Sequence, residues 1–205
     1  MPENASSVSG QGWPADALSP FLRSAAGMDS NIFAGAKLAT WLPDQTTLNQ
    51  LAEPRPVGNY FVRPPNGYES QPVADKSGRA NAYYWVGQRR SDGSSGIFTV
   101  IIAQQPTGGS DNTVESILRS ELKTAKEQVD NLEEQPWDRG LINGHLFVRA
   151  RFRGLHKEMQ KRVSGFFFAA IFDKECVLIG ALDVDPHSEV TLRLKESAAA
   201  TFRRR

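Results

Sequence analysis

The sequence lacks several features that mark specialised classes of protein. It contains one cysteine, Cys176, which excludes an intrachain disulfide; its apolar neighbours favour a buried, inert thiol. Its 24 Lys and Arg nearly balance 23 Asp and Glu, which argues against a globally basic nucleic-acid binder.

No apolar run approaches the roughly 18 residues of a membrane helix. The start of the chain has no basic and apolar stretch typical of a secretory signal. We therefore expect a cytoplasmic protein by default, or an exported one if the chain is a mature fragment.

Motifs for catalysis, metals and nucleotides are also missing. The three histidines, His145, His156 and His187, stand alone rather than at the spacing that brings two ligands to one metal. The glycines do not form a phosphate-binding loop, and no Gly-x-Ser-x-Gly motif is present. We expect no metal, no cofactor and no enzymatic activity.

The chain divides into three parts by composition. Residues 1–16 are small and polar and predict a disordered tail. Residues 17–58 carry short apolar clusters between breakers, and they predict a short helical extension that ends in the stiff connector Glu53-Pro54-Arg55-Pro56. Residues 59–205 predict one α+β domain.

Within this domain the pattern indicates a sheet with two helices. A short strand is expected at 59–63, and the runs 82–90 and 97–105, joined by a Gly-rich loop, predict a hairpin. Apolar residues at helical spacing predict a helix over 113–132. The runs 145–153, 163–172 and 176–182 predict a three-strand meander, and 188–202 predicts a closing helix.

This order of elements resembles the Mog/PsbP-like superfamily over about residues 59–203. The matching motifs are Pro65-Asn66-Gly67-Tyr68, Asn143-Gly144 before the first meander strand, Asp173 at the next turn, and Thr201-Phe202 near the end. The resemblance implies an antiparallel sheet sandwiched between helices, with an N-terminal extension here. It also implies action by binding other proteins, although it supplies no universal functional residues.

A row of basic residues is the strongest functional signal. Six cations stand against Glu158 alone; they are Arg149, Arg151, Arg153, Lys157, Lys161 and Arg162. On one interpretation, acidic residues of the same chain neutralise the row, the candidates being Glu133, Glu134, Asp138, Glu121 and Glu127. On the other, the row binds an acidic surface of another protein or a phosphate-bearing ligand.

A second cluster, Asp183, Asp185, His187 and Glu189, combines carboxylates with an imidazole. It fits either a site for a cation or proton transfer, or a strand-to-helix loop in which Asp185 or Ser188 caps the helix. The capping interpretation explains more of these residues.

These patterns favour a non-enzymatic protein-interaction or assembly domain. One alternative is a module that binds an anion or nucleic acid through Arg149, Arg151 and Arg153. A second is an enzyme with a site near Asp183, Asp185 and His187. The sequence does not identify the biological process, the partner or the oligomeric state.

Overall fold

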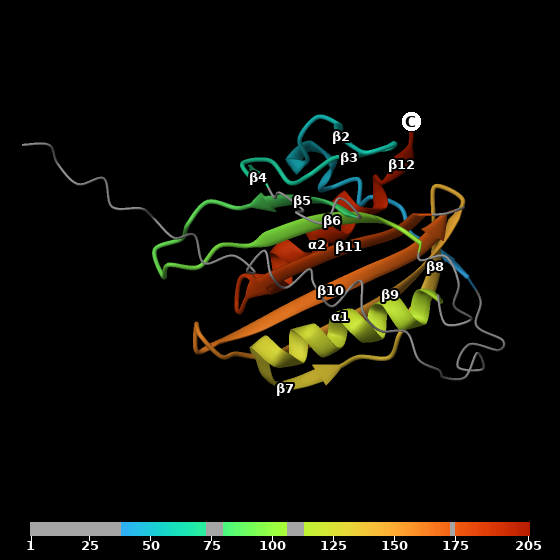
Figure 1. The fold of residues 1–205 in the computed structure, drawn as a ribbon. Coiled ribbons are helices and arrows are strands. Elements are labelled where there is room, and N and C mark those ends of the chain that lie inside the picture. Colours follow the sequence, from blue (N-terminus) through green and yellow to red (C-terminus); the bar gives the residue numbers. More distant parts are fainter. Residues whose placement is uncertain (1–37, 73–79, 106–112, 173–174) are drawn as a thin grey trace, which may run out of the picture.

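A computed structural model describes residues 38–72, 80–105, 113–172 and 175–205 of the chain, which form two β-sheets and two α-helices (Figure 1). The elements in chain order are β1 (Ala39–Thr40), the 3-10 turn η2 (Leu48–Gln50), β2 (Arg55–Val57), β3 (Tyr60–Val62), β4 (Glu69–Pro72), β5 (Ala80–Val86), β6 (Ile97–Gln104), α1 (Val114–Gln128), β7 (Val129–Glu134), β8 (Asp138–Ile142), β9 (His145–His156), β10 (Lys161–Phe172), β11 (Glu175–Val184), α2 (Ser188–Ala200) and β12 (Arg203–Arg204).

The larger sheet has nine strands, in the order β1-β8-β9-β10-β11-β6-β5-β4, with β7 paired to β9 beside β8. Its centre is the antiparallel series β9, β10, β11 and β6, which contains the predicted meander. The predicted hairpin is β5 and β6. The smaller sheet has the order β12-β3-β2. Because β1 pairs with β8 in parallel, the larger sheet is mixed rather than purely antiparallel as predicted.

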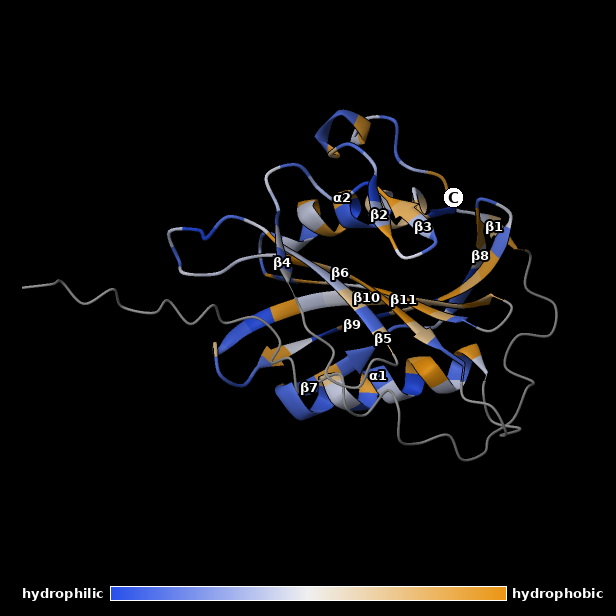
Figure 2. Cartoon of the chain, turned by 45° about the horizontal axis from the view of Figure 1, so that its top comes forward, coloured by the Kyte–Doolittle hydropathy of each residue, from blue (hydrophilic) through white to orange (hydrophobic). Residues whose placement is uncertain are grey.

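Alternation along the central strands divides the core into two layers. Phe166 and Phe168 of β10 face α2 and the smaller sheet, whereas Phe167 between them faces α1. The α2 layer includes Phe98, Phe147, Ala198 and Phe202, and the α1 layer includes Leu118, Leu122, Phe152 and Leu178. Both faces of β10 are therefore apolar, and Figure 2 shows α1 with its apolar and polar residues on different sides.

Helix α1 forms where the periodicity predicts it but ends earlier. Thr113 caps its first turn, since its side-chain oxygen accepts a hydrogen bond from Ser116 N at 3.2 Å. The helix ends at Gln128, and Val129 enters β7, which pairs with the far end of β9. The expectation of helix up to residue 132 was wrong because the unpaired edge of β9 recruits these residues into the sheet.

The α+β class is confirmed, in a form dominated by sheet. The described ranges contain two helices against twelve strands, so helices cover less of the sheet than the predicted sandwich implies. The described part of the predicted extension, residues 38–58, forms β1, η2 and β2, and it places Leu51 and Val57 in the core. The predicted tail, the rest of the extension and Asp173 lie outside the described residues.

Cys176 is buried, and burial raises the pKa of its thiol to about 11, as expected for an unreactive core cysteine. None of the helices in the described ranges is long and apolar enough to cross a membrane.

Candidate functional site

The predicted basic row begins on the α2 face of β9. Arg149 is 8% exposed, and its guanidinium lies over the rings of Trp41 and Phe168, with 4.8 and 5.4 Å between the guanidinium carbon and the ring centres. It pairs in a bidentate manner with Asp138 of the neighbouring strand and reaches Glu196 of α2 at 3.3 Å. Arg149 therefore ties α2 to the sheet and is not free to receive a ligand.

Most other members of the row also have an acidic partner within the chain. Arg151 Nε lies 2.8 Å from Glu196, Arg153 Nε 2.7 Å from Glu133, Lys157 Nζ 3.5 Å from Asp130 and Lys161 Nζ 3.0 Å from Asp92. Arg162 is exposed and has no ion pair with another described residue. Five of the six cations of the row therefore pair with acidic residues of the same chain, as the first interpretation of the row expects.

The partners differ in part from the expected ones. Glu133 and Asp138 neutralise the row as predicted, but Glu196 was missed because it lies on a helix far along the sequence. Glu134 pairs with Lys126 instead. Glu121, expected beside the row, points into the opposite face of the sheet, because α1 packs on the other side of β9 and β10.

The acidic cluster at 183–189 is divided between the core and the surface. Asp183 is fully buried; its carboxylate accepts hydrogen bonds from Arg90 at 2.6 and 2.9 Å, Lys195 at 2.8 Å and Thr191 at 2.6 Å. These partners, despite burial, lower its pKa below the usual range. Asp183 has no open face for a substrate.

Asp185 accepts hydrogen bonds from the hydroxyls of Ser188 and Ser164. The N-cap position of α2 is His187, which makes no side-chain cap, so the prediction that Asp185 or Ser188 caps the backbone was wrong. Asp185 instead holds the side chain of Ser188, the first residue of α2.

The buried ion network around Asp183 also involves Tyr68 and Gly96. Lys195 Nζ lies over the Tyr68 ring, and a Cβ atom at Gly96 would come within 2.5 Å of the Tyr68 hydroxyl and 2.6 Å of Lys195 Nζ. Burial lowers the pKa of Lys195 to about 8, partly opposed by Asp183. The charged groups of the network find their partners within it, which indicates that the network holds α2 against the β5–β6 hairpin.

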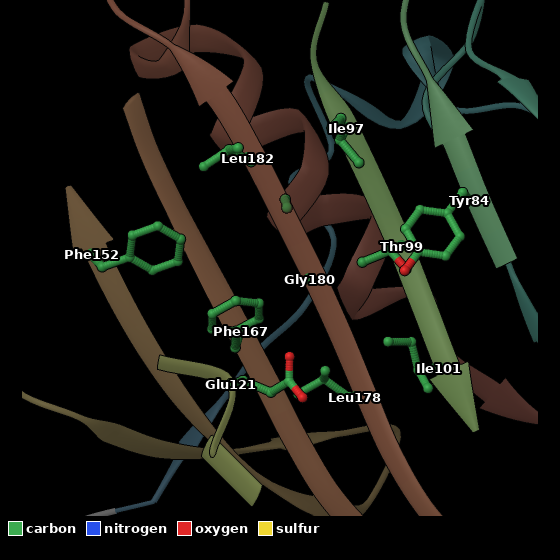
Figure 3. A pocket seen from close by; sticks show the side chains of 11 residues that line it. Tyr84, Ile97, Thr99, Ile101, Glu121, Phe152, Phe167, Leu178, Gly180 and Leu182 are labelled. Atoms are coloured by element: carbon green, nitrogen blue, oxygen red, sulfur yellow. The ribbon is translucent and has the colours of Figure 1, made fainter. Parts of the chain in front are cut away.

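An apolar groove lies on the other face of the sheet, beside α1. Helix α1 packs against β10, β7 and β9, and this leaves β11, β6 and β5 to form the rest of the groove (Figure 3). Its walls are apolar side chains, namely Ile97, Ile101, Phe152, Phe167, Leu178 and Leu182, around Gly180. The groove is open to solvent on one side, and the space in it that is free for a water-sized molecule is about 40 Å³. An apolar lining with a few polar side chains is typical of small-molecule sites.

Three polar side chains point into the groove. The carboxyl of Glu121 lies among Phe167 and Leu178, and the hydroxyls of Tyr84 and Thr99 come together on the opposite wall (Figure 3). The Thr99 oxygen is buried and has no hydrogen bond of good geometry to another described residue. These groups can therefore orient a bound molecule.

The environment of Glu121 favours its protonated form. Burial raises its pKa from 4.5 to about 7, and no hydrogen bond or ion pair joins this carboxyl to another described residue. Burial, together with the nearby Glu121, also raises the pKa of Tyr84 to about 12. A carboxyl desolvated without a partner marks a candidate functional site. Within the described ranges no three His, Cys, Asp or Glu residues converge as metal ligands.

Over most of its length the chain has a PsbP-like fold. Over 84% of this chain and 97% of the other, the fold matches cyanobacterial PsbP (CyanoP) from Synechocystis sp. with a TM-score of 0.53 and 14% identity. LpqN of Mycobacterium tuberculosis, described as involved in cell envelope biogenesis, matches over 73% of this chain and 87% of its own, with a TM-score of 0.54 and 8% identity.

These likenesses confirm the fold expected from the sequence resemblance. No family model matches the sequence, and the search of the curated proteins found no match to it.

Sequence reasoning missed the groove. Glu121 occupies the apolar stripe of α1, between Leu118 and Leu122 on one side and Ala125 on the other. A carboxyl at such a position was the available signal, because an acidic residue facing a core is rare unless it is paired. The residues across the groove come from distant strands, so no local pattern could have joined them.

Proposed function

We propose that this chain is a non-enzymatic binding domain that holds a small apolar ligand in the groove between α1 and the sheet. The observation that carries the proposal is the unpaired Glu121 carboxyl among apolar walls, opposite two hydroxyls. An apolar residue at this position would favour packing more, since the half-buried Glu121 carboxyl loses part of its hydration without gaining a partner among the described residues. The cost is understandable if the carboxyl serves a ligand.

The polar groups restrict the ligand. Glu121, Tyr84 and Thr99 offer hydrogen bonds, and within the part of the chain that the structure describes no Lys, Arg or His lines the groove. A carboxylate or phosphate ligand would be buried beside Glu121 without a cation, which is unfavourable. The ligand is therefore apolar and either neutral or cationic.

A groove-filling variant tests this function. Ile97 lies at the start of β6 and is 8% exposed, so Ile97→Trp adds bulk to the groove. Val190 of α2 is 74% exposed and remote from the groove, and Val190→Trp is the matched control. We expect isothermal titration calorimetry with 1-octanol to show binding with a negative heat-capacity change to wild type and to Val190→Trp. For Ile97→Trp we expect binding weakened by about tenfold or more.

Thermal denaturation of each variant confirms that it is folded. The proposal fails if wild type binds no octanol, or if a folded Ile97→Trp binds it as tightly as wild type does.

A second candidate function is binding of an acidic protein surface at the exposed end of the basic row. The Arg162 side chain makes no ion pair in the described ranges. The Arg153–Glu133 pair is exposed, so it contributes only about 0 to 1 kcal/mol and is easily exchanged. The double variant Arg153→Gln, Arg162→Gln would then lose retention of a protein from nuclease-treated lysate at low salt. If instead wild type retains material from untreated lysate and loses it after nuclease treatment, the alternative of anion or nucleic-acid binding is favoured.

A further inference from the structure

Among the described residues that line the groove, Glu121 is the one acidic side chain and none carries a positive charge. The lining residues from β5, β6, β9, β10 and β11 include one other titratable group, the Tyr84 hydroxyl. The helical neighbours of Glu121 at three and four residues' distance are uncharged; they are Ile117, Leu118, Thr124 and Ala125. In the described part of the molecule, nothing on either wall can neutralise the Glu121 carboxylate.

The cations of α1 and of the neighbouring β8 are engaged elsewhere. Lys126 pairs with Glu134 at 2.7 Å, and Arg139 pairs with Glu115 at 2.7 Å. The Arg119 guanidinium lies 5.3 Å from the centre of the Trp137 ring. Lys123, two residues after Glu121, is exposed and projects from a different side of the helix. Among the described residues, none therefore supplies a cation to Glu121.

The shape of the groove restricts the rest of the ligand. One wall is a helix and the other a sheet surface, and most of the apolar lining side chains are already largely buried against each other. An unbranched chain is the apolar group that enters such a narrow space with the least displacement of side chains.

On the basis of the proposed function, we propose that the ligand is an amphiphile with one unbranched apolar chain and one primary ammonium group, which pairs with the Glu121 carboxylate. The ammonium supplies a positive charge beside the carboxylate, and its three N–H donors allow further hydrogen bonds in the groove. A charge-assisted hydrogen bond in a desolvated groove is about twice as strong as a neutral one. The carboxyl thereby selects an amine over an alcohol of the same length.

This pairing makes the selection depend on pH. Burial raises the pKa of Glu121 to about 7, so the carboxyl is mostly ionised at about pH 8 and mostly protonated at about pH 5.5. Octylamine stays protonated throughout this range. Its advantage over octanol should therefore grow as the pH rises and collapse as Glu121 takes up a proton.

The test compares octylamine, 1-octanol and octanoate by calorimetry at about pH 5.5 and 8. The proteins are wild type, Glu121→Gln and Glu127→Gln, whose substituted position lies on the same helix but is exposed. At the higher pH we expect octylamine to bind wild type and Glu127→Gln about tenfold or more tighter than octanol, and octanoate to bind weakest. Glu121→Gln should lose this preference and keep its affinity for octanol.

The outcomes separate the two proposals. If octanol does not bind wild type, the proposed function itself fails. If octanol binds but octylamine binds no better, or if Glu121→Gln keeps the preference, the groove is an apolar site and the ammonium inference is wrong. If N-acetyl-lysine methyl ester binds as tightly as octylamine does, the apolar chain is not recognised and the inference is overturned in favour of a protein lysine.

Discussion

Lys195 Nζ lies 2.8 Å from Asp183 Oδ2, and both side chains are fully buried. Arg90 reaches the same carboxylate from the β5–β6 hairpin with two hydrogen bonds, so Asp183 is the shared partner of two cations. The network joins α2, β11 and the hairpin. Its members therefore contribute unequally to stability.

We predict that Asp183→Asn destabilises the protein more than Lys195→Met does. Loss of the shared carboxylate leaves Lys195 buried without its acidic partner, so it must either stay charged in the core or give up its proton, and this costs about 3 to 5 kcal/mol in free energy of unfolding. Lys195→Met leaves the Arg90–Asp183 pair intact and replaces the buried ammonium with an apolar chain. Urea denaturation at neutral pH measures both variants. Equal losses, or a larger loss for Lys195→Met, would contradict the shared-partner account.

A second prediction concerns stability and pH. Because the pKa of Glu121 is raised from 4.5 to about 7 in the folded state, the unfolded chain releases this proton first as the pH rises. Folding stability should therefore fall between about pH 4.5 and 7, by an amount on the order of 3 kcal/mol from this group.

Glu121→Gln should lack this fall. The measurement is the difference in free energy of unfolding between wild type and Glu121→Gln across the range, which cancels the other titrating groups. A difference that stays constant with pH would show that Glu121 titrates normally.

A third prediction separates the two ends of the basic row. Arg149 is buried under Trp41 and pairs with Asp138 and Glu196. Arg149→Gln should therefore lower the free energy of unfolding by about 2 kcal/mol or more. Arg153→Gln removes an exposed ion pair with Glu133 and should lower the free energy of unfolding by no more than about 1 kcal/mol. Denaturant midpoints report both. A harmless Arg149→Gln would mean that this arginine is free for a ligand after all.

The order of elements was predictable because each long element carries its own local signal. Each of these signals lies within one continuous segment of the sequence: the periodicity of α1, the loop between β5 and β6, and the alternation of β9. The segments 129–134 and 138–142 were not predicted as strands, since they form by pairing with β9 rather than by strong propensity.

The candidate site was predictable only in part. The charge of the row Arg149–Arg162 is visible in the sequence, but its neutralisation depends on Glu196 and Asp92, which are 47 residues after Arg149 and 69 residues before Lys161. The groove is built from five strands and a helix, so its location follows from tertiary packing. Glu121 was the one local sign, because a carboxylate interrupts an otherwise apolar helix stripe.

The most direct test of the account is an amide chemical-shift titration of the protein with 1-octanol. We predict that shifts concentrate on the amides of β6 near Ile97 to Ile101, of β11 near Leu178 to Leu182, and of α1 around Glu121. The same titration of Ile97→Trp should lose them. Shifts that concentrate on β9 near Arg149 to Arg153, or no shifts at concentrations that saturate a binding site, would contradict the claim that the groove is where this domain binds.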